Sequence, residues 1–164
     1  MPITLEGSCR CGAVRFTVAS HTPHPYQLCY CSICRKTAGA AGAAINIMGT
    51  AASLNVTGRQ ALATYSAEIV DEDGGVETSE GQRHFCRLCA TPLWLFDPRW
   101  PDLVHPFASC IDTPLPTPPH RVHILLDDKP AWVQADVRPG DESYDGLPDL
   151  SIEEWHKRQG LWVD

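Results

Sequence analysis

The sequence lacks a long hydrophobic run. Among its 164 residues, no apolar stretch approaches the roughly 18 residues that a membrane-spanning helix needs. The N-terminus, Met1 to Glu6, has neither the basic start nor the apolar stretch of a signal peptide. We therefore expect a cytoplasmic protein whose cysteines stay reduced.

Positive charge is also scarce. The chain has 13 lysines and arginines against 20 aspartates and glutamates, and its formal net charge is −7. Binding to nucleic acid without regard to sequence requires a basic face, and so does binding to an anionic membrane surface. We expect neither a nucleic-acid partner nor a membrane partner.

Several familiar catalytic motifs are missing as well. The sequence has no phosphate-cradling glycine loop and no dinucleotide-binding fingerprint, because Gly39, Gly42 and Gly49 do not fit the spacing. No Ser/His/Asp arrangement is apparent either. These absences turn attention to the cysteines.

Glycine and proline are frequent, with 12 and 14 residues, and they separate short apolar stretches. This pattern is typical of short strands and predicts a mainly β protein that forms a single domain over residues 1–164. Val14, Phe16 and Val18 alternate within the predicted strand 13–18 and share one face. Further strand candidates are residues 42–48, 61–65, 93–96 and 122–126. Residues 71–75 read as a hairpin tip, and residues 113–119 as an extended proline-rich connector.

The C-terminus carries a clear helix signal. Ser151 and Glu154 have the spacing of a capping box, and Ile152 and Trp155 share a face. Gly160 is a plausible stop. A second, shorter helical turn is expected after Cys34, over residues 35–38.

Cysteine is abundant: the chain has eight, and seven of them form three clusters. A Cys-x-Cys pair in an extended segment points both sulfurs to one face, and a Cys-x-x-Cys pair in a tight turn lets two sulfurs share one metal. We expect the first and third clusters to complete a structural zinc site with four cysteine ligands. Its ligands would be Cys9, Cys11, Cys86 and Cys89.

The central cluster has three sulfurs, from Cys29, Cys31 and Cys34. A zinc ion with three protein ligands keeps an open position for water, for a thiol, or for one more ligand. The main competing interpretation is a second structural zinc, closed by a fourth ligand from His or Asp. His84 and His123 are the two histidines worth considering as fourth ligands or site neighbours.

Three further residues give less specific signals. Arg35 and Lys36 could offset the excess negative charge of the central cluster, or they could be ordinary solvated residues. Cys110, outside the clusters, is expected to be a small buried hydrophobic residue.

Three segments together resemble the glutathione-dependent formaldehyde-activating enzyme family, which includes the centromere protein V group. They are residues 7–16 (Gly-Ser-Cys-Arg-Cys-Gly-Ala-Val-Arg-Phe), 29–36 (Cys-Tyr-Cys-Ser-Ile-Cys-Arg-Lys) and 84–93 (His-Phe-Cys-Arg-Leu-Cys-Ala-Thr-Pro-Leu). Weaker matches follow at residues 128–132 and 144–148. The resemblance covers a core of about residues 5–148, and leaves a helical extension of about 149–164, which could cover a surface or mediate self-association as a homo-oligomer.

The resemblance implies an Mss4-like fold of short antiparallel sheets organised around zinc, with two zinc ions per chain. It implies a structural zinc on the four-cysteine set and a second, labile zinc on Cys29, Cys31 and Cys34. It also implies a carbon–sulfur lyase that joins formaldehyde and glutathione into S-hydroxymethylglutathione. The chain departs from the family pattern at Ala90, where glycine is usual, and at Tyr30, where histidine is frequent.

Our leading hypothesis is a zinc-dependent thiol–aldehyde adduct synthase or lyase, with a small thiol such as glutathione entering the open position beside the catalytic cysteines. The alternative is a binding or scaffold module with two structural zinc ions. A redox protein of the methionine sulfoxide reductase B type ranks lower, because no cysteine lies in that enzyme's catalytic context.

Overall fold

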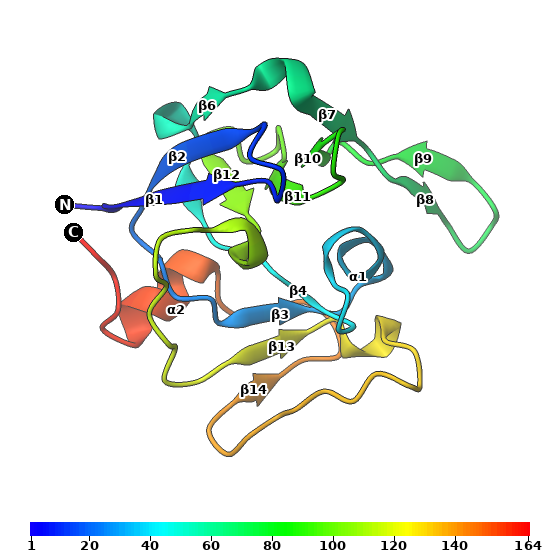
Figure 1. Ribbon diagram of the computed structural model, residues 1–164. Helices are drawn as coiled ribbons and strands as arrows, with labels where there is room; N and C mark the ends of the chain where they lie inside the picture. Colours follow the sequence, from blue (N-terminus) through cyan, green and yellow to red (C-terminus); the bar gives the residue numbers. More distant parts are fainter.

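The computed structural model describes all residues, 1–164, and is mainly β. Three small sheets, one separate hairpin and two short helices make up the regular structure, as the sequence predicts (Figure 1). Both helices have seven residues, and neither has the length and apolarity that crossing a bilayer would require. Four 3-10 turns lie between the strands: η1 (Ala51–Ser53), η2 (Arg59–Ala61), η3 (Ala108–Cys110) and η4 (Leu126–Asp128).

The first sheet has three antiparallel strands in the order β1-β2-β6. They are β1 (Ile3–Ser8), β2 (Arg15–Ser20) and β6 (Asn55–Thr57). The predicted alternation is confirmed, since Val14, Phe16 and Val18 are all at most 3% exposed. The strand itself starts two residues later than expected, at Arg15, because the preceding residues form the first cysteine turn.

The second sheet has five antiparallel strands in the order β5-β12-β11-β10-β7. They are β5 (Gly49–Thr50), β12 (Leu103–Pro106), β11 (Pro92–Phe96), β10 (Gln82–Cys86) and β7 (Leu62–Tyr65). Phe16 of the first sheet meets Trp94 of the second edge to face, with ring centroids 5.2 Å apart. This aromatic contact joins the two sheets within one continuous apolar core.

The third sheet has four strands in the order β14-β13-β3-β4. They are β14 (Glu142–Ser143), β13 (Val122–Ile124), β3 (Gln27–Cys29) and β4 (Ala44–Ile45). The expected antiparallel pairing holds in the other sheets and between β3 and β4, whereas β13 runs parallel to both β3 and β14. Parallel neighbours need long connections, and the chain supplies them between residues 29 and 122 and between 124 and 142.

Two predicted strands are shorter in the structure. The candidate at 42–48 is paired in a named strand only at Ala44–Ile45, with single bridges at Asn46 and Met48. The candidate at 122–126 ends at Ile124, because Leu125 has a φ of 59° and begins a turn. A left-handed residue cannot continue a strand.

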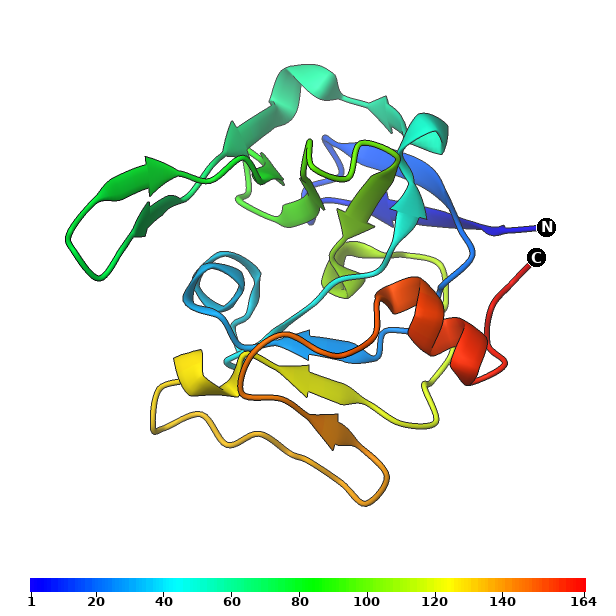
Figure 2. The ribbon, with the colours of Figure 1, turned by 180° about the vertical axis from the view of Figure 1, so that it is seen from behind.

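The remaining segments match their predictions. The hairpin β8 (Glu68–Val70) and β9 (Val76–Thr78) turns through residues 71–75 and extends away from the body in both views (Figures 1 and 2). The proline-rich connector 113–119 contains neither helix nor strand. The short helix after the central cysteines is α1 (Ser32–Ala38), which begins three residues earlier than expected.

The C-terminal helix α2 (Ile152–Arg158) has the predicted capping box between Ser151 and Glu154. It covers the protein's own surface: Trp155 is 1% exposed and stacks on Tyr26, with ring centroids 3.7 Å apart. His156, next along the helix, is fully buried and hydrogen-bonds to the Ile152 carbonyl at 2.8 Å.

The turn between β10 and β11 has an unusual backbone. Ala90 has a φ of 60°, as the family resemblance at this position anticipates, and a side chain in this region is strained by roughly 1 kcal/mol. The corresponding residue of the first cysteine turn is Gly12, whose φ is 76° and which carries no such strain.

We predict that Ala90→Gly stabilises the protein. Glycine relieves the left-handed strain and loses part of the gain to a more flexible unfolded chain, so the free energy of unfolding should rise by about 0.5–1 kcal/mol. Gly12→Ala is the matched reverse change and should lower the free energy of unfolding by a similar amount. Denaturant unfolding measures both, and a less stable Ala90→Gly variant would contradict the strain argument.

We predict that buried His156 makes stability fall in mild acid. Burial lowers the pKa of His156 to about 4 from an ordinary 6.5, so the folded state stays neutral while the unfolded chain takes up a proton. Stability should therefore be complete above pH 6.5 and be lost progressively as the pH falls from 6.5 toward 4.

The test is to compare unfolding free energies of the wild type and His156→Asn across this pH range. Asparagine can still donate to the Ile152 carbonyl but does not titrate, so the variant should show the flatter profile. Any loss of metal in acid affects both proteins equally. Parallel profiles would rule out His156 as a source of the acid sensitivity.

Candidate functional site

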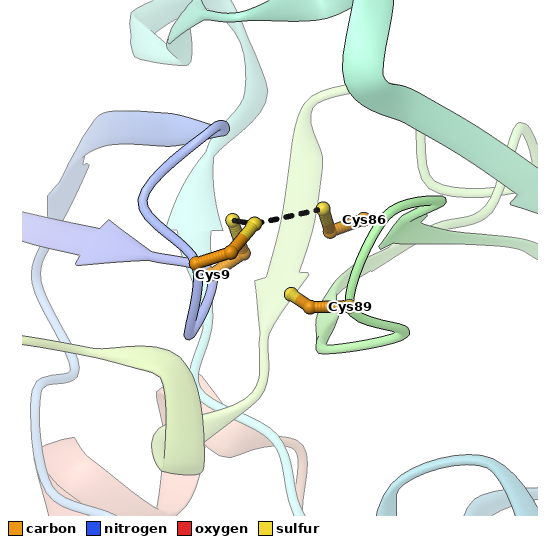
Figure 3. Close-up of side chains that lie close together, drawn as sticks. Cys9, Cys86 and Cys89 are labelled. Atoms are coloured by element: carbon orange, nitrogen blue, oxygen red, sulfur yellow. Dashed lines mark hydrogen bonds between the residues drawn. The ribbon is translucent and has the colours of Figure 1, made fainter.

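The structure brings the first and third cysteine clusters together. Cys9 and Cys11 lie in the turn between β1 and β2, whereas Cys86 is the last residue of β10 and Cys89 lies in the turn between β10 and β11. Figure 3 shows Cys9 facing Cys86 and Cys89 across the gap between the two turns. All four sulfur atoms lie within 4.8 Å of one another, although 75 residues separate Cys11 from Cys86.

The geometry of this four-sulfur cluster fits a tetrahedral metal. The Sγ atoms of Cys9 and Cys11 are 3.5 Å apart, and those of Cys11 and Cys86 are 3.8 Å apart. Four sulfurs at about 2.3 Å from one zinc ion would be separated by about 3.8 Å. The donor set is also the thiolate set that zinc prefers, so the cluster could hold this metal.

In each turn, a residue with positive φ donates a backbone hydrogen bond to the carbonyl of the first cysteine. In the first, Gly12 donates its N–H to the Cys9 carbonyl at 2.9 Å; in the second, Ala90 donates to the Cys86 carbonyl at 2.7 Å. Thr91 joins the two turns, because its hydroxyl accepts from the backbone N–H of Arg10 at 3.0 Å and lies 3.2 Å from the Cys89 sulfur. The Thr91 hydroxyl and backbone N–H lower the pKa of Cys89 to about 5, which favours its thiolate.

The central cluster lies where β3 ends and α1 begins. Cys29 is the last residue of β3, Cys31 is the N-cap of α1, and Cys34 is in the first turn of that helix. The Cys31 sulfur accepts the backbone N–H of Cys34 at 3.3 Å, which fixes the turn. The three sulfurs lie within 4.8 Å of one another, and Cys29 and Cys34 are 6% and 4% exposed.

Three thiols this close, two of them buried, compete for negative charge. The thiols of Cys29 and Cys34 hydrogen-bond to Cys31 and lower its pKa to about 2, whereas the same interactions and burial raise the pKa of Cys29. A divalent cation removes this competition, because it stabilises all three thiolates together. The cluster therefore fits a soft divalent metal such as zinc.

No histidine, aspartate or glutamate places a ligand atom within the central group. Of the two candidate fourth ligands, His84 directs Nδ1 to the Thr64 hydroxyl at 3.1 Å and stacks on Trp94. His123 directs Nδ1 to the Tyr30 hydroxyl at 2.9 Å. Both histidines thus have other partners, and the group offers three candidate ligand atoms, all of them sulfur.

His123 belongs to a buried polar chain behind the central cluster. Its Nε2 lies 3.5 Å from Asp141, and burial lowers its pKa, so the ring is neutral. Burial opposes ionisation of Asp141, but N–H groups of Arg121 and Arg138 and the Arg121 guanidinium hold its pKa well below the usual range. This chain fixes Tyr30 between the first two cysteine ligands, which accounts structurally for tyrosine at this position.

Sequence reasoning missed Arg83, a residue of β10 that reaches the central cluster. Its Nη2 lies 3.7 Å from the Cys34 sulfur and its Nη1 lies 3.5 Å from the Thr37 hydroxyl. Arg35 and Lys36, the expected cations, make no hydrogen bond to a sulfur. No local pattern identifies Arg83, because 49 residues separate it from Cys34.

Cys110 stands apart from both clusters. Its thiol is 4% exposed and contacts the carbonyls of Leu93 and Phe107, each at 3.1 Å. Burial raises its pKa to about 12, so this cysteine is a small neutral core residue, as predicted.

Comparison with known proteins supports one family. The family model described as glutathione-dependent formaldehyde-activating enzyme matches residues 4–128. A protein of Halomonas elongata whose name carries the same words is 59% identical over 157 residues, covering 96% of this chain and 97% of its own. The crystal structure of a Rhodobacter sphaeroides protein has a similar fold, with a TM-score of 0.51 and 22% identity over 68% of this chain and 91% of its own. The family model ends before the weaker C-terminal motifs, but all three cysteine clusters lie inside it. The chain belongs to the glutathione-dependent formaldehyde-activating enzyme family.

Proposed function

We propose that this protein is a carbon–sulfur lyase of the thiol–aldehyde type, which forms or cleaves the adduct of glutathione and an aldehyde. The observation that carries the proposal is the central cluster: three sulfurs within 4.8 Å, no fourth carboxylate or histidine ligand, and an arginine at its edge. Family membership supports the same reaction class.

In this proposal, zinc binds at both clusters. Cys9, Cys11, Cys86 and Cys89 hold a structural ion, and Cys29, Cys31 and Cys34 hold a second ion that leaves one position open. When bound at the central cluster, zinc supplies the positive charge that keeps an incoming thiol deprotonated at neutral pH. We further propose that the chain acts as one unit in a reducing cytoplasm, consistent with its eight free cysteines.

The bond changes of the adduct reaction are simple. The thiol sulfur attacks the aldehyde carbon, a C–S bond forms, and the electron pair of the C=O π bond moves to oxygen. The proton released by the thiol ends on that oxygen, which gives a neutral hemithioacetal. Cleavage is the same sequence reversed.

The protein's own residues contribute charge and position. Three thiolates and a divalent cation leave one net negative charge, and the Arg83 guanidinium beside Cys34 offsets it. An N–H group of the same guanidinium can donate to the developing oxyanion, which is the usual role of fixed donors in carbonyl chemistry. Thr37 orients Arg83 through the contact between its hydroxyl and Nη1.

We predict that glutathione changes the coordination of one of the two zinc ions. X-ray absorption at the zinc edge should show additional sulfur coordination when reduced glutathione is added to the zinc-loaded protein. S-methylglutathione is the matched control, because its thioether has no thiolate to offer. A spectrum that reduced glutathione leaves unchanged would favour a scaffold with two closed sites.

We predict opposite outcomes for serine substitutions in the two clusters. Cys86→Ser should unfold or strongly destabilise the protein, because a structural zinc contributes about 10 kcal/mol or more, comparable with the whole stability of a domain. Cys31→Ser should melt within about 5 °C of the wild type and lose one equivalent of zinc, because the cluster it belongs to lies within a single continuous segment.

Metal analysis and thermal melts measure both variants. A normal melt with two zinc equivalents for Cys86→Ser would refute the structural role of the four-sulfur cluster. Collapse of Cys31→Ser would show that the central cluster also holds the fold together.

A further inference from the structure

A cleft runs between α1 and the start of β11, beside the central cluster. It consists of two adjoining hollows of about 250 Å3 and about 440 Å3. Thr37 and Pro92 line both hollows, so the two are neighbours that share a wall. We call them the apolar end and the basic end of the cleft.

The apolar end is the smaller hollow. Tyr65, Phe85 and Phe107 present three aromatic rings to it, and Pro92 completes the wall. Its volume of about 250 Å3 exceeds the roughly 150 Å3 in which an apolar cavity already binds benzene. This end can therefore take a hydrocarbon group of up to about phenyl size.

The basic end is the larger hollow. Arg35 and Lys36 of α1 line it, neither forms an ion pair, and the first turn of α1 has no acidic residue. In a protein with a net charge of −7, two adjacent unpaired cations on one wall favour an anionic ligand. A peptide carboxylate has the charge and the geometry that such a wall accepts.

Arg83 stands where the two ends meet the central cluster. It lines the apolar end, its Nη1 contacts Thr37 of the shared wall, and its Nη2 lies 3.7 Å from the Cys34 sulfur. Arg83 thus connects the apolar end to the central cluster, and Thr37 connects the apolar end to the basic end.

We propose that this cleft binds the S-substituted adduct of a carboxylate-bearing thiol, so that the aldehyde handled by the enzyme carries an apolar carbon substituent. The inference rests on the proposed function and names its substrate class. The basic end takes the carboxylates of the thiol peptide, and the apolar end takes the substituent on the aldehyde carbon. Formaldehyde has no such substituent and would leave the apolar end unused.

The experiment measures binding to the zinc-loaded protein by isothermal titration calorimetry. S-methylglutathione and S-benzylglutathione are the two probes, since each carries a group on sulfur and neither has a free thiol. We expect S-benzylglutathione to bind at least tenfold more tightly, because burying a phenyl ring adds far more apolar area than burying a methyl group. Equal affinities, or no binding of either probe at millimolar concentration, would overturn the proposal.

Two variants test the contributions of the two ends of the cleft separately, and each has a control variant. Tyr65→Ser removes an aromatic wall at a position that is 47% exposed, and should reduce the preference for S-benzylglutathione severalfold. Trp132→Ser, at another exposed aromatic residue outside the cleft, is its control. Lys36→Gln should weaken both probes by a similar factor of about 3–10 and leave their ratio unchanged. Lys157→Gln, on the exposed side of α2, should have no effect.

The binding experiment tests the cleft separately from the proposed catalytic function. Thioether probes bind without a thiolate, so a tenfold preference together with an unresponsive zinc spectrum would leave the cleft assigned and refute the lyase. Equal affinities with a responsive spectrum would keep the lyase and refute the assignment of a substituted aldehyde.

Discussion

The architecture depends on one cross-chain constraint, the approach of four cysteine sulfurs to within 4.8 Å. Two of them belong to the three-stranded sheet and two to the five-stranded sheet, so a metal held there fastens the sheets at their turns. The Phe16–Trp94 contact joins the same sheets through the core. Strands of only two to six residues hold few ladder hydrogen bonds each, and a metal bound by the four sulfurs would add a link between distant segments that such short strands do not provide.

The two clusters differ in how the chain builds them. The first draws its sulfurs from two segments that are 75 residues apart, counted from Cys11 to Cys86, whereas the second draws all three from one segment of six residues. Loss of the first would free a long stretch of chain, and loss of the second would not. The central cluster also has more polar neighbours. A series of buried side-chain contacts runs from Tyr30 through His123 to Asp141 next to it, and Arg83 connects it to the cleft.

The charge near the cleft is opposite in sign to the net charge of the protein. The protein is acidic, yet Arg35, Lys36 and Arg83 gather around the cleft without a carboxylate partner. Such an arrangement concentrates positive potential where a thiolate or a peptide carboxylate would bind in the proposed function. The proposed anionic ligand fits this local reversal of sign.

The sequence by itself determined the local features. Cysteine spacing predicted both clusters, alternation predicted the burial of Val14, Phe16 and Val18, and the Ser151–Glu154 pair predicted α2. These signals are short-range, so a single sequence contains them completely. Tertiary structure alone decided the parallel pairing of β13, the early end of that strand at Leu125, the partners of His84 and His123, and the position of Arg83 beside Cys34. Each of these features depends on packing between segments that are tens of residues apart. The folding free energy of the whole core decides such packing, and no periodic or local sequence pattern encodes it.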